Sequence, residues 1–203
     1  MIPPALSQRA IDFIISCEVS SRAHYEAALQ HPIWPGAQSG ITIGVGYDCG
    51  MGTAERVRTD WGPHLSLQDV ARLANTAGVI GPAALDLVPI LADITVPWDA
   101  ALAVFITHDI PRFADITARA FPNCDLLSGD SFGALVSLVF NRGAGMEGDR
   151  RLEMRYILAA MQDRDFAAIP AYIRDMKRLW PGMRGLRDRR DAEAALFEDG
   201  LVA

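Results

Sequence analysis

The sequence predicts a mainly α-helical, α+β protein in which a small β-hairpin lies near the N-terminus. Apolar residues recur at spacings of three and four along most of the chain, which is typical of amphipathic helices. Near residue 40 this period changes to alternation, with Ile41, Ile43 and Val45 separated by small or polar residues. Residues 130–141 are apolar nearly all round, so we expect them to form a buried central helix.

The first helix is expected over residues 5–18 and ends at Glu18. Glu18 lies near the apolar stripe that this helix should bury. An apolar environment and a helix C-terminus both disfavour an ionised carboxylate, so Glu18 suits the role of a general acid. The alternative is an ordinary solvated glutamate at a helix end. The apolar stripe consists of Leu6, Ala10, Phe13, Ile14 and Cys17.

Residues 34–50 organise the chain, because they place polar side chains in a run that glycines keep open. This stretch holds five glycines in 17 residues. Glycines at such spacing indicate tight turns, or backbone that another group approaches closely. We expect the hairpin over about residues 40–48, with Thr42, Tyr47 and Asp48 on it.

Helices are expected to fill most of the remaining chain. Residues 19–33 are polar and should be irregular. Ser66 is a suitable helix N-cap, whereas Pro111 and Pro122 should end helices. The expected helices span residues 53–61, 66–77, 82–91, 97–109, 111–120, 130–141, 151–161, 166–179 and 185–197.

Composition fits an ordinary globular protein. The chain has 203 residues, of which 50% are hydrophobic and 22% charged, so it can bury one sizeable core or form two small lobes. We expect a single domain over residues 1–203, with a helix-and-hairpin lobe over about residues 1–62. A helical lobe should follow over about residues 63–203.

The charge pattern argues against several classes of partner. The net charge is −6, and no block rich in Lys or Arg occurs before residues 184–190, so nucleic acid is not an expected partner. No apolar run reaches the ~18 residues of a membrane span, so we expect no stable membrane insertion. The first residues lack the basic start and apolar core of a signal peptide.

Neither the histidines nor the cysteines have the spacing of a metal site, so we expect no metal and no cofactor. The cysteines Cys17, Cys49 and Cys124 are expected to be free and mostly buried. A disulfide between Cys17 and Cys49 is the alternative, since each adjoins a candidate carboxylate.

Taken together, the first helix and the hairpin resemble a known family. Glu18 is followed seven residues later by Tyr25, and then by the run Ser-Gly-Ile-Thr-Ile-Gly-Val-Gly-Tyr-Asp. This pattern resembles the phage-type lysozymes, muramidases like those of glycoside hydrolase family 24, and most closely their pesticin-like branch. That branch pairs a helix-end Glu with a Thr and an Asp on the hairpin, here Glu18, Thr42 and Asp48. In the better-known phage lysozymes the Asp precedes the Thr, but the matching position here is Ala27.

The resemblance is firm over about residues 10–50 and weaker elsewhere. It includes the run Phe-Asn-Arg-Gly at residues 140–143 and the closing helix at residues 185–197, whereas residues 55–125 match no pattern of the family. Within the closing helix, the arginines are expected to form solvated ion pairs with Asp188, Asp191 and Glu193. These arginines are Arg187, Arg189 and Arg190.

The resemblance implies a lysozyme-like fold and hydrolysis of the β-1,4 bond between N-acetylmuramic acid and N-acetylglucosamine in bacterial peptidoglycan. Glu18 would be the general acid, Asp48 the second, ionised carboxylate, and Thr42 would hold the attacking water, with inversion at the sugar. The residues alone leave alternatives open. Thr42 also suits a strand by propensity, and Asp48 suits a turn cap beside Gly50.

Five further residues are candidates for substrate binding. Tyr47 would form a wall of the saccharide cleft, or it would stack in the core. Gln38 and Ser39 would contact sugar hydroxyls, although a turn is the favoured interpretation. The resemblance puts Asn141 and Arg142 at the cleft floor, where a polar helix C-terminus is the competing interpretation.

The implied partners follow from a peptidoglycan substrate. The protein is expected to be a monomer that is made in the cytoplasm and acts in the periplasm or cell wall. Its export would depend on a holin or a secretion system, and an immunity protein would be a further partner. The alternative function is a catalytically silent module that keeps the lysozyme-like fold and binds or organises peptidoglycan.

Overall fold

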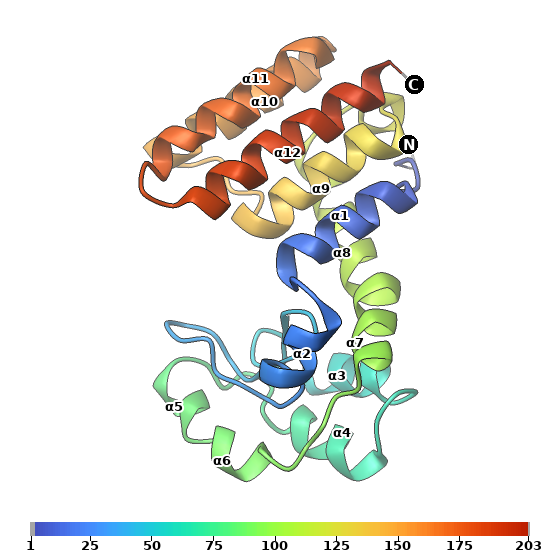
Figure 1. Cartoon of the computed structure of the whole chain (residues 1–203), viewed down its shortest axis with the longest axis vertical. Helices are drawn as coiled ribbons and strands as arrows, with labels where there is room; N and C mark the ends of the chain where they lie inside the picture. Colours follow the sequence, from blue (N-terminus) through green and yellow to red (C-terminus); the bar gives the residue numbers. More distant parts are fainter. Residues whose placement is uncertain (1–2, 203) are drawn as a thin grey trace. The chain divides into compact units, whose positions relative to one another are not determined.

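The computed structural model describes residues 3–202, which form a mainly helical chain with one two-stranded antiparallel hairpin (Figure 1). The predicted fold class is therefore confirmed. The chain divides into two compact units. We call Ile15–Asp109 the hairpin unit, and Met1–Ile14 together with Ile110–Ala203 the helical unit.

Residues 63–109 pack with the hairpin, whereas the sequence placed them in the helical lobe beyond residue 62. The Tyr25 hydroxyl donates a hydrogen bond of 2.9 Å to the carbonyl of Val96, and the Val96 N–H donates to the Gln30 carbonyl at 2.8 Å. The Gly81 N–H likewise donates to the carbonyl of Ser39 at 2.9 Å. These contacts join segments far apart in sequence, so hydrophobic periodicity gives no sign of them.

The hairpin unit is built from short elements around the end of helix α1 (Gln8–Glu18). Ser66 caps α4 as predicted, because its side chain accepts a hydrogen bond of 3.1 Å from the Asp69 N–H. The elements that follow α1 are α2 (Arg22–Ala28), β1 (Thr42–Ile43), β2 (Tyr47–Asp48), α3 (Ala54–Trp61), α4 (Leu67–Ala74), α5 (Pro82–Leu85), α6 (Val88–Leu91), α7 (Trp98–Val104) and the π-helical segment η1 (Phe105–Asp109).

Helix α2 corrects the prediction that residues 19–33 are irregular throughout. Ser21 caps this helix by accepting a hydrogen bond of 3.1 Å from the His24 N–H. Tyr25 is fully buried, and its ring lies 5.2 Å from that of Trp98 in α7. Tyr25 is the one buried residue of α2, so the sequence of this short helix carries no apolar stripe.

Two prolines act differently from the prediction. Residues 82–91 form two short helices because Pro89 stands in the first turn of α6, where a missing N–H is tolerated, and not inside a helix. The predicted break at Pro111 is wrong, since helical structure continues from α7 through η1 into α8 (Ile110–Ala120). Pro111 cannot donate a backbone hydrogen bond, and the wider π-helical turn η1 just before it accommodates this proline within continuous helical structure.

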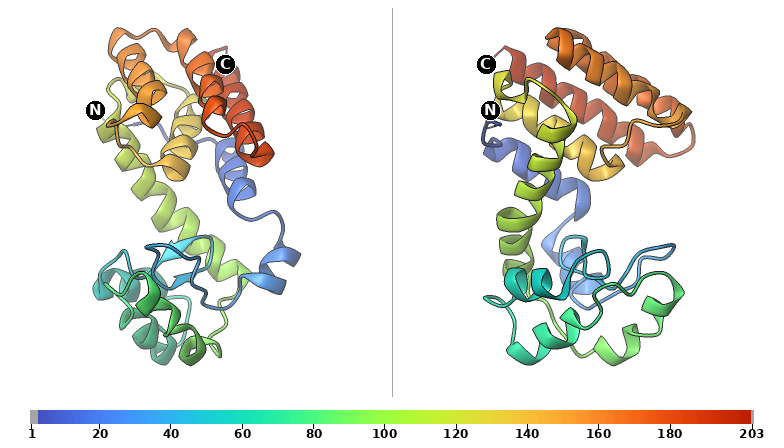
Figure 2. Two further views of the ribbon diagram at one scale, coloured as in Figure 1. Left: turned by 90° about the vertical axis from the view of Figure 1, so that its left-hand side faces the viewer. Right: turned by 180° about the vertical axis from the view of Figure 1, so that it is seen from behind.

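The helical unit surrounds α9 (Gly129–Arg142), which the sequence predicted as the central helix. Ser128 caps α9, and nine consecutive residues of it, 131–139, are buried. Helix α12 packs along both α9 and α11, as Figures 1 and 2 show. The remaining elements of this unit are η2 (Cys124–Leu126), η3 (Asp149–Arg151), α10 (Leu152–Asp163), η4 (Phe166–Ala168), α11 (Ile169–Asp175), η5 (Met176–Leu179) and α12 (Arg184–Leu201).

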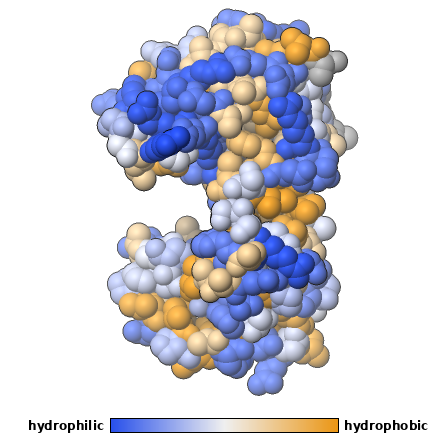
Figure 3. All heavy atoms as spheres, viewed as in Figure 1, coloured by the Kyte–Doolittle hydropathy of each residue, from blue (hydrophilic) through white to orange (hydrophobic). Residues whose placement is uncertain are grey.

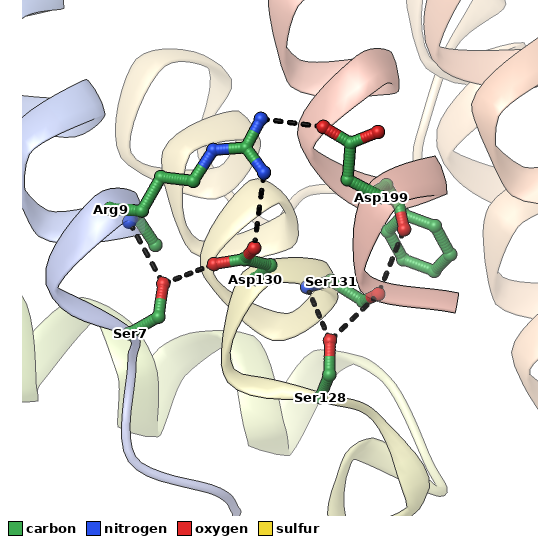
Figure 4. Close-up of polar contacts among 8 residues, drawn as sticks. Ser7, Arg9, Ser128, Asp130, Ser131 and Asp199 are labelled. Atoms are coloured by element: carbon green, nitrogen blue, oxygen red, sulfur yellow. Dashed lines mark hydrogen bonds and ion pairs between the residues drawn. The ribbon is translucent and has the colours of Figure 1, made fainter. Parts of the chain in front are cut away.

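The start of α1 is tied to α9 and α12 by polar side chains (Figure 4). The Ser7 hydroxyl accepts a hydrogen bond from the Ala10 N–H at 3.0 Å and donates one to Asp130. Arg9 pairs with Asp130 at 3.4 Å and with Asp199 at 2.5 Å. Ser7 therefore caps its own helix and also joins it to the first turn of α9.

Two of the three arginines of α12 that were expected to form solvated ion pairs are buried instead. Arg190 and Glu193 are fully buried, and Arg189 is 9% exposed. Glu193 Oε1 accepts hydrogen bonds from Ser137 Oγ at 2.7 Å, from Arg189 Nε at 3.1 Å and from Arg190 Nη2 at 2.9 Å. Its other oxygen lies 2.9 Å from Arg190 Nε, an ion-pair contact without hydrogen-bond alignment. The pairing of Arg189 and Arg190 with Glu193 is as predicted, but it lies in the core between α9 and α12, whereas Arg187 is exposed.

The face of the molecule in Figure 3 is mostly hydrophilic, with small separate hydrophobic patches. None of the helices within residues 3–202 has the length and apolar character needed to cross a membrane.

Candidate functional site

Glu18 and Thr42 line one cavity of about 180 Å³ in the hairpin unit. Glu18 is the last residue of α1 and is partly exposed, while Thr42 begins β1 and is 8% exposed. Apart from these two, the cavity is lined by apolar residues and glycines, namely Val19, Leu29, Ile33, Pro35, Gly44 and Gly46. The structure thus brings a carboxyl group and a hydroxyl group together from segments 24 positions apart in the sequence.

Thr42 is fixed by backbone hydrogen bonds on one side and faces Asp48 on the other. Its N–H donates to the Ile33 carbonyl at 2.8 Å, and its carbonyl accepts from the Ile33 N–H at 3.0 Å. In the hairpin register Thr42 is the direct partner of Asp48. Directly opposed residues of an antiparallel pair project to the same face, with Cβ atoms about 5 Å apart. The two candidate residues therefore lie on the same face of the hairpin.

The Asp48 carboxylate is held by two backbone N–H groups. Gly40 N lies 3.2 Å from Oδ1 and 3.0 Å from Oδ2, and Met51 N donates to Oδ1 at 3.1 Å. These contacts belong to a turn-capping aspartate, the alternative that the sequence left open. They also hold the carboxyl group in one position on the hairpin, as a catalytic group requires.

Asp48 can take this position only because position 40 carries no side chain. A Cβ atom on Gly40 would lie 2.6 Å from Asp48 Oδ1 and 2.5 Å from the Cα atom of Gly50. A Cβ atom on Gly50 would lie 2.3 Å from the carbonyl oxygen of Val79. The sequence predicted close backbone approach in this stretch, and the structure shows where it occurs.

Gly44 and Gly46 form the turn of the hairpin and leave the cavity open. Their φ angles are +59° and +76°, in the left-handed region that other residues rarely adopt. A Cβ atom on Gly44 would meet the Trp61 ring at 2.9 Å, whereas one on Gly46 would meet no atom within 4 Å. One glycine thus permits packing against α3, and the other leaves open space beside the cavity.

Tyr47 is a core residue, so its assignment to the substrate-binding set is corrected. It is only 2% exposed, and its ring meets that of Trp61 edge-on with centroids 5.5 Å apart. Its hydroxyl donates a hydrogen bond of 2.8 Å to Asp60, and burial raises the pKa of this phenol. In β2 the side chains of Tyr47 and Asp48 point to opposite faces, which separates the core residue from the candidate acidic residue.

Tyr47 belongs to a buried polar network behind the hairpin that the sequence did not reveal. Asp60 is 2% exposed and also lies 3.3 Å from His108 Nδ1 and 3.7 Å from Arg56 Nε. Arg56 lies over the Tyr47 ring, 4.8 Å from its centroid, and 3.9 Å from Asp109. His108 and Asp109 belong to the π-helical turn η1, which no pattern in the sequence indicated.

Gln38 and Ser39 lie in a turn, the interpretation that the sequence favoured. Ser39 N donates to the Gly36 carbonyl at 3.1 Å, and the Ser39 carbonyl accepts from the Trp34 indole at 3.0 Å. Gln38 is exposed and does not line the cavity that contains Glu18.

Asn141 and Arg142 belong to the helical unit, at the last turn of α9. The Asn141 side-chain oxygen accepts a hydrogen bond of 3.1 Å from Arg190, and Arg142 lies over the Trp180 ring at 4.8 Å. Both residues line a second cavity of about 490 Å³ at the end of this helix.

The three cysteines are free thiols, as expected from the sequence. Burial raises the pKa of Cys49 and of Cys124 to about 12, with smaller contributions from Asp48 and Asp125 respectively. Both thiols therefore stay protonated at neutral pH, which makes them poor nucleophiles.

Metal binding has no evident site in the part of the chain that the structure describes. Within residues 3–202, no group of three or more His, Cys, Asp or Glu side chains is arranged to hold a metal ion. Comparison with protein-family models and with curated proteins gives no match for this chain.

Proposed function

We propose that this chain is a muramidase, a glycoside hydrolase that cleaves the β-1,4 bond between N-acetylmuramic acid and N-acetylglucosamine in peptidoglycan. The observation that carries the proposal is the shared cavity of Glu18 and Thr42, with Asp48 opposite Thr42 on the hairpin. The resemblance of these three residues to the pesticin-like lysozymes supplies the reaction.

The proposed reaction uses two carboxyl groups in unlike surroundings. Protonated Glu18 gives its proton to the glycosidic oxygen as the bond from that oxygen to the anomeric carbon breaks. A water molecule held by Thr42 attacks the anomeric carbon from the opposite face and passes a proton to Asp48. In this inverting course the two carboxyl groups stand about 6.5–9.5 Å apart, which leaves room for the water. The first product formed should be the α-anomer, which proton NMR can detect.

The test of the proposed acid is Glu18→Gln, which removes the proton donor and nearly preserves shape. Release of new reducing ends from purified peptidoglycan should fall by at least about 10²-fold. Glu26→Gln is the matched control, because Glu26 is an exposed glutamate of α2 that pairs with Arg22 at 2.7 Å. This control should keep full activity. Release of free amino groups without reducing ends would indicate an amidase or peptidase and would contradict the proposal.

A second candidate is a peptidoglycan-binding module without turnover. The observation that favours it is the capping of Asp48 by the Gly40 and Met51 N–H groups, which gives this carboxylate a structural task. Asp48→Asn separates the two candidates. A hydrolase should lose activity in this variant and still bind insoluble peptidoglycan. A binding module should sediment with peptidoglycan and release no reducing ends even as the wild-type protein.

The site of action follows from the proposed substrate. Peptidoglycan lies outside the cytoplasmic membrane, so a muramidase made in the cytoplasm needs a holin or a secretion system to reach it. An immunity protein would protect a producing cell.

A further inference from the structure

The hairpin that carries Asp48 is too short to fix this residue by strand pairing alone. Each strand has two residues, Thr42–Ile43 in β1 and Tyr47–Asp48 in β2. Even a hairpin of ordinary length is at best marginally stable in water. The Gly40 and Met51 N–H groups hold the Asp48 carboxylate, but they belong to the loops beside the same strands. The direction in which β2 presents Asp48 therefore depends on a contact from outside the hairpin.

Tyr47 makes such a contact from the rear face of β2. Consecutive strand residues project to opposite faces, so a rotation of β2 that moves Asp48 also moves Tyr47. Helix α3 holds the Tyr47 side chain at two points. Its ring meets Trp61 edge-on with centroids 5.5 Å apart, and its hydroxyl donates a hydrogen bond of 2.8 Å to Asp60. The ring contact keeps Tyr47 in the core, and the buried hydrogen bond to a carboxylate fixes how deeply it inserts.

Asp60 can anchor Tyr47 because its own position is fixed by neighbouring groups. It is 2% exposed and lies in the last turn of α3. His108 Nδ1 lies 3.3 Å from Asp60 Oδ1, and Arg56 Nε lies 3.7 Å from Asp60 Oδ2. Arg56 Nε is buried and makes no hydrogen bond within residues 3–202, so its contact with Asp60 is one of charge. Asp60 is thus held from η1 and from the first turn of α3.

Arg56 connects this cluster to the chain on both sides of Asp48. Its guanidinium lies over the Tyr47 ring, 4.8 Å from the centroid. A Cβ atom on Gly52 would lie 3.5 Å from Arg56 Cδ and Nη1, so the loop after β2 lies against this side chain. The N–H of Met51, next to Gly52, is one of the groups that hold Asp48. The buried cluster therefore supports both the residue before Asp48 and the loop after it.

We propose that Tyr47 and Asp60 are positioning residues, which hold Asp48 where it can direct the attacking water. This inference rests on the proposed function, in which Asp48 accepts a proton from that water. Misplacing a reacting group by about 1 Å can lower a rate by about 10²-fold. Both side chains are buried behind the hairpin, so a change in either should lower kcat and leave KM unchanged.

The kinetic test uses the whole chain and soluble, uncrosslinked peptidoglycan chains as substrate. Tyr47→Phe keeps the ring and removes the hydroxyl, so kcat should fall at least about fivefold while KM stays within about twofold of the wild type. Asp60→Asn keeps an oxygen that can accept the Tyr47 hydrogen bond, so it should retain at least about half of the wild-type kcat. Arg58→Gln, which changes an exposed arginine of α3, is the matched control and should alter neither constant.

A second measurement follows Asp48 directly and needs no activity. In NMR spectra, the amide protons of Gly40 and Met51 report the hydrogen bonds that they donate to the Asp48 carboxylate. A longer hydrogen bond deshields its proton less, so both signals should move upfield in Tyr47→Phe. Both should keep their wild-type positions in Arg58→Gln.

These outcomes separate the inference from the proposed function. If the wild-type protein releases no reducing ends, the proposed function fails, and the amide signals still decide whether Tyr47 holds Asp48. A role in stability alone would lower the melting temperature of Tyr47→Phe without any other change. Wild-type kcat or wild-type amide signals in folded Tyr47→Phe would therefore overturn the inference. A loss of kcat in Asp60→Asn as large as that in Tyr47→Phe would overturn the role of the hydrogen bond.

Discussion

The hairpin unit and the helical unit each hold a carboxylate at a defined position, but they do so by different means. In the hairpin, Asp48 is held by backbone N–H groups in a space that exists because Gly40 has no side chain. In the helical unit, Glu193 is held by the side chains of Ser137, Arg189 and Arg190. The position of a carboxylate held by backbone N–H groups should be disturbed by a substitution that adds atoms nearby. The position of a carboxylate held by side chains should instead be disturbed by a substitution that removes atoms from those side chains.

Glu193→Gln should have the largest effect on stability, because it removes the charge that compensates two buried arginines. Breaking a buried ion pair in this way costs about 3–5 kcal/mol in the free energy of unfolding. Urea unfolding followed by circular dichroism measures the loss. The control is Glu198→Gln in the same helix, whose exposed pair with Arg174 should contribute about 0–1 kcal/mol. Equal losses in the two variants would remove the distinction between buried and exposed pairs.

Gly40→Ala should have the next largest effect, because its Cβ atom would overlap Asp48 and the Gly50 backbone. Forced overlap of this kind costs about 1–3 kcal/mol, and it should also displace Asp48 and reduce any hydrolysis. Gly52→Ala is the matched control in the same loop, since its Cβ atom would come no closer than 3.5 Å to Arg56. Amide exchange of the hairpin compares the two. If the hairpin amides of Gly40→Ala exchange as slowly as those of the wild type, the position of Asp48 does not depend on the absence of a side chain at residue 40.

The smallest expected effect is a loss of stability at alkaline pH. Cys49 in the hairpin unit and Cys124 in the helical unit both contribute to it. The pKa of Cys49 and of Cys124 is raised to about 12 in the folded protein, from an ordinary value of 9.0. Protonated thiols therefore favour the folded state fully below about pH 9, and this contribution is lost as the pH rises toward about 12. For Cys49 the loss is about 1 kcal/mol over the first pH unit above its ordinary value.

The pH dependence of urea unfolding between pH 8 and 11 tests this prediction. Cys49→Ala and Cys124→Ala should each flatten the curve, and the double variant should flatten it further. The buried phenols of Tyr25 and Tyr47, whose pKa values are also raised by burial, should leave a residual slope. A slope that is the same in the double variant and the wild type would contradict the assignment to thiols.

The sequence was most informative where a local pattern decides the structure. Alternation and glycine spacing predicted the hairpin, and near-continuous apolarity predicted α9. The cap at Ser66 followed from its own side chain. For the candidate site, the pattern brought Glu18 and Thr42 forward, and they share a cavity.

The sequence was least informative where a distant partner decides the structure. Helix α2 depends on Tyr25 bonding to Val96, and the buried state of Arg190 depends on α9. Tyr47 is a core residue because Asp60 and Trp61 lie behind it, which a strand pattern cannot show. The network around His108 depends on a π turn, for which the spacing of apolar residues gives no signal.

The order of the two units along the chain has a consequence for biosynthesis. The hairpin unit is one continuous segment, whereas the helical unit needs Met1–Ile14 and Ile110–Ala203 together. As the chain leaves the ribosome, the segment that carries Glu18, Thr42 and Asp48 is therefore complete before α9 and α12 exist. Because domains fold as units during synthesis, we expect the hairpin to form first. The start of α1 cannot pack until α9 has been synthesised. Ala10 therefore stays exposed until Gly133 is available to contact it.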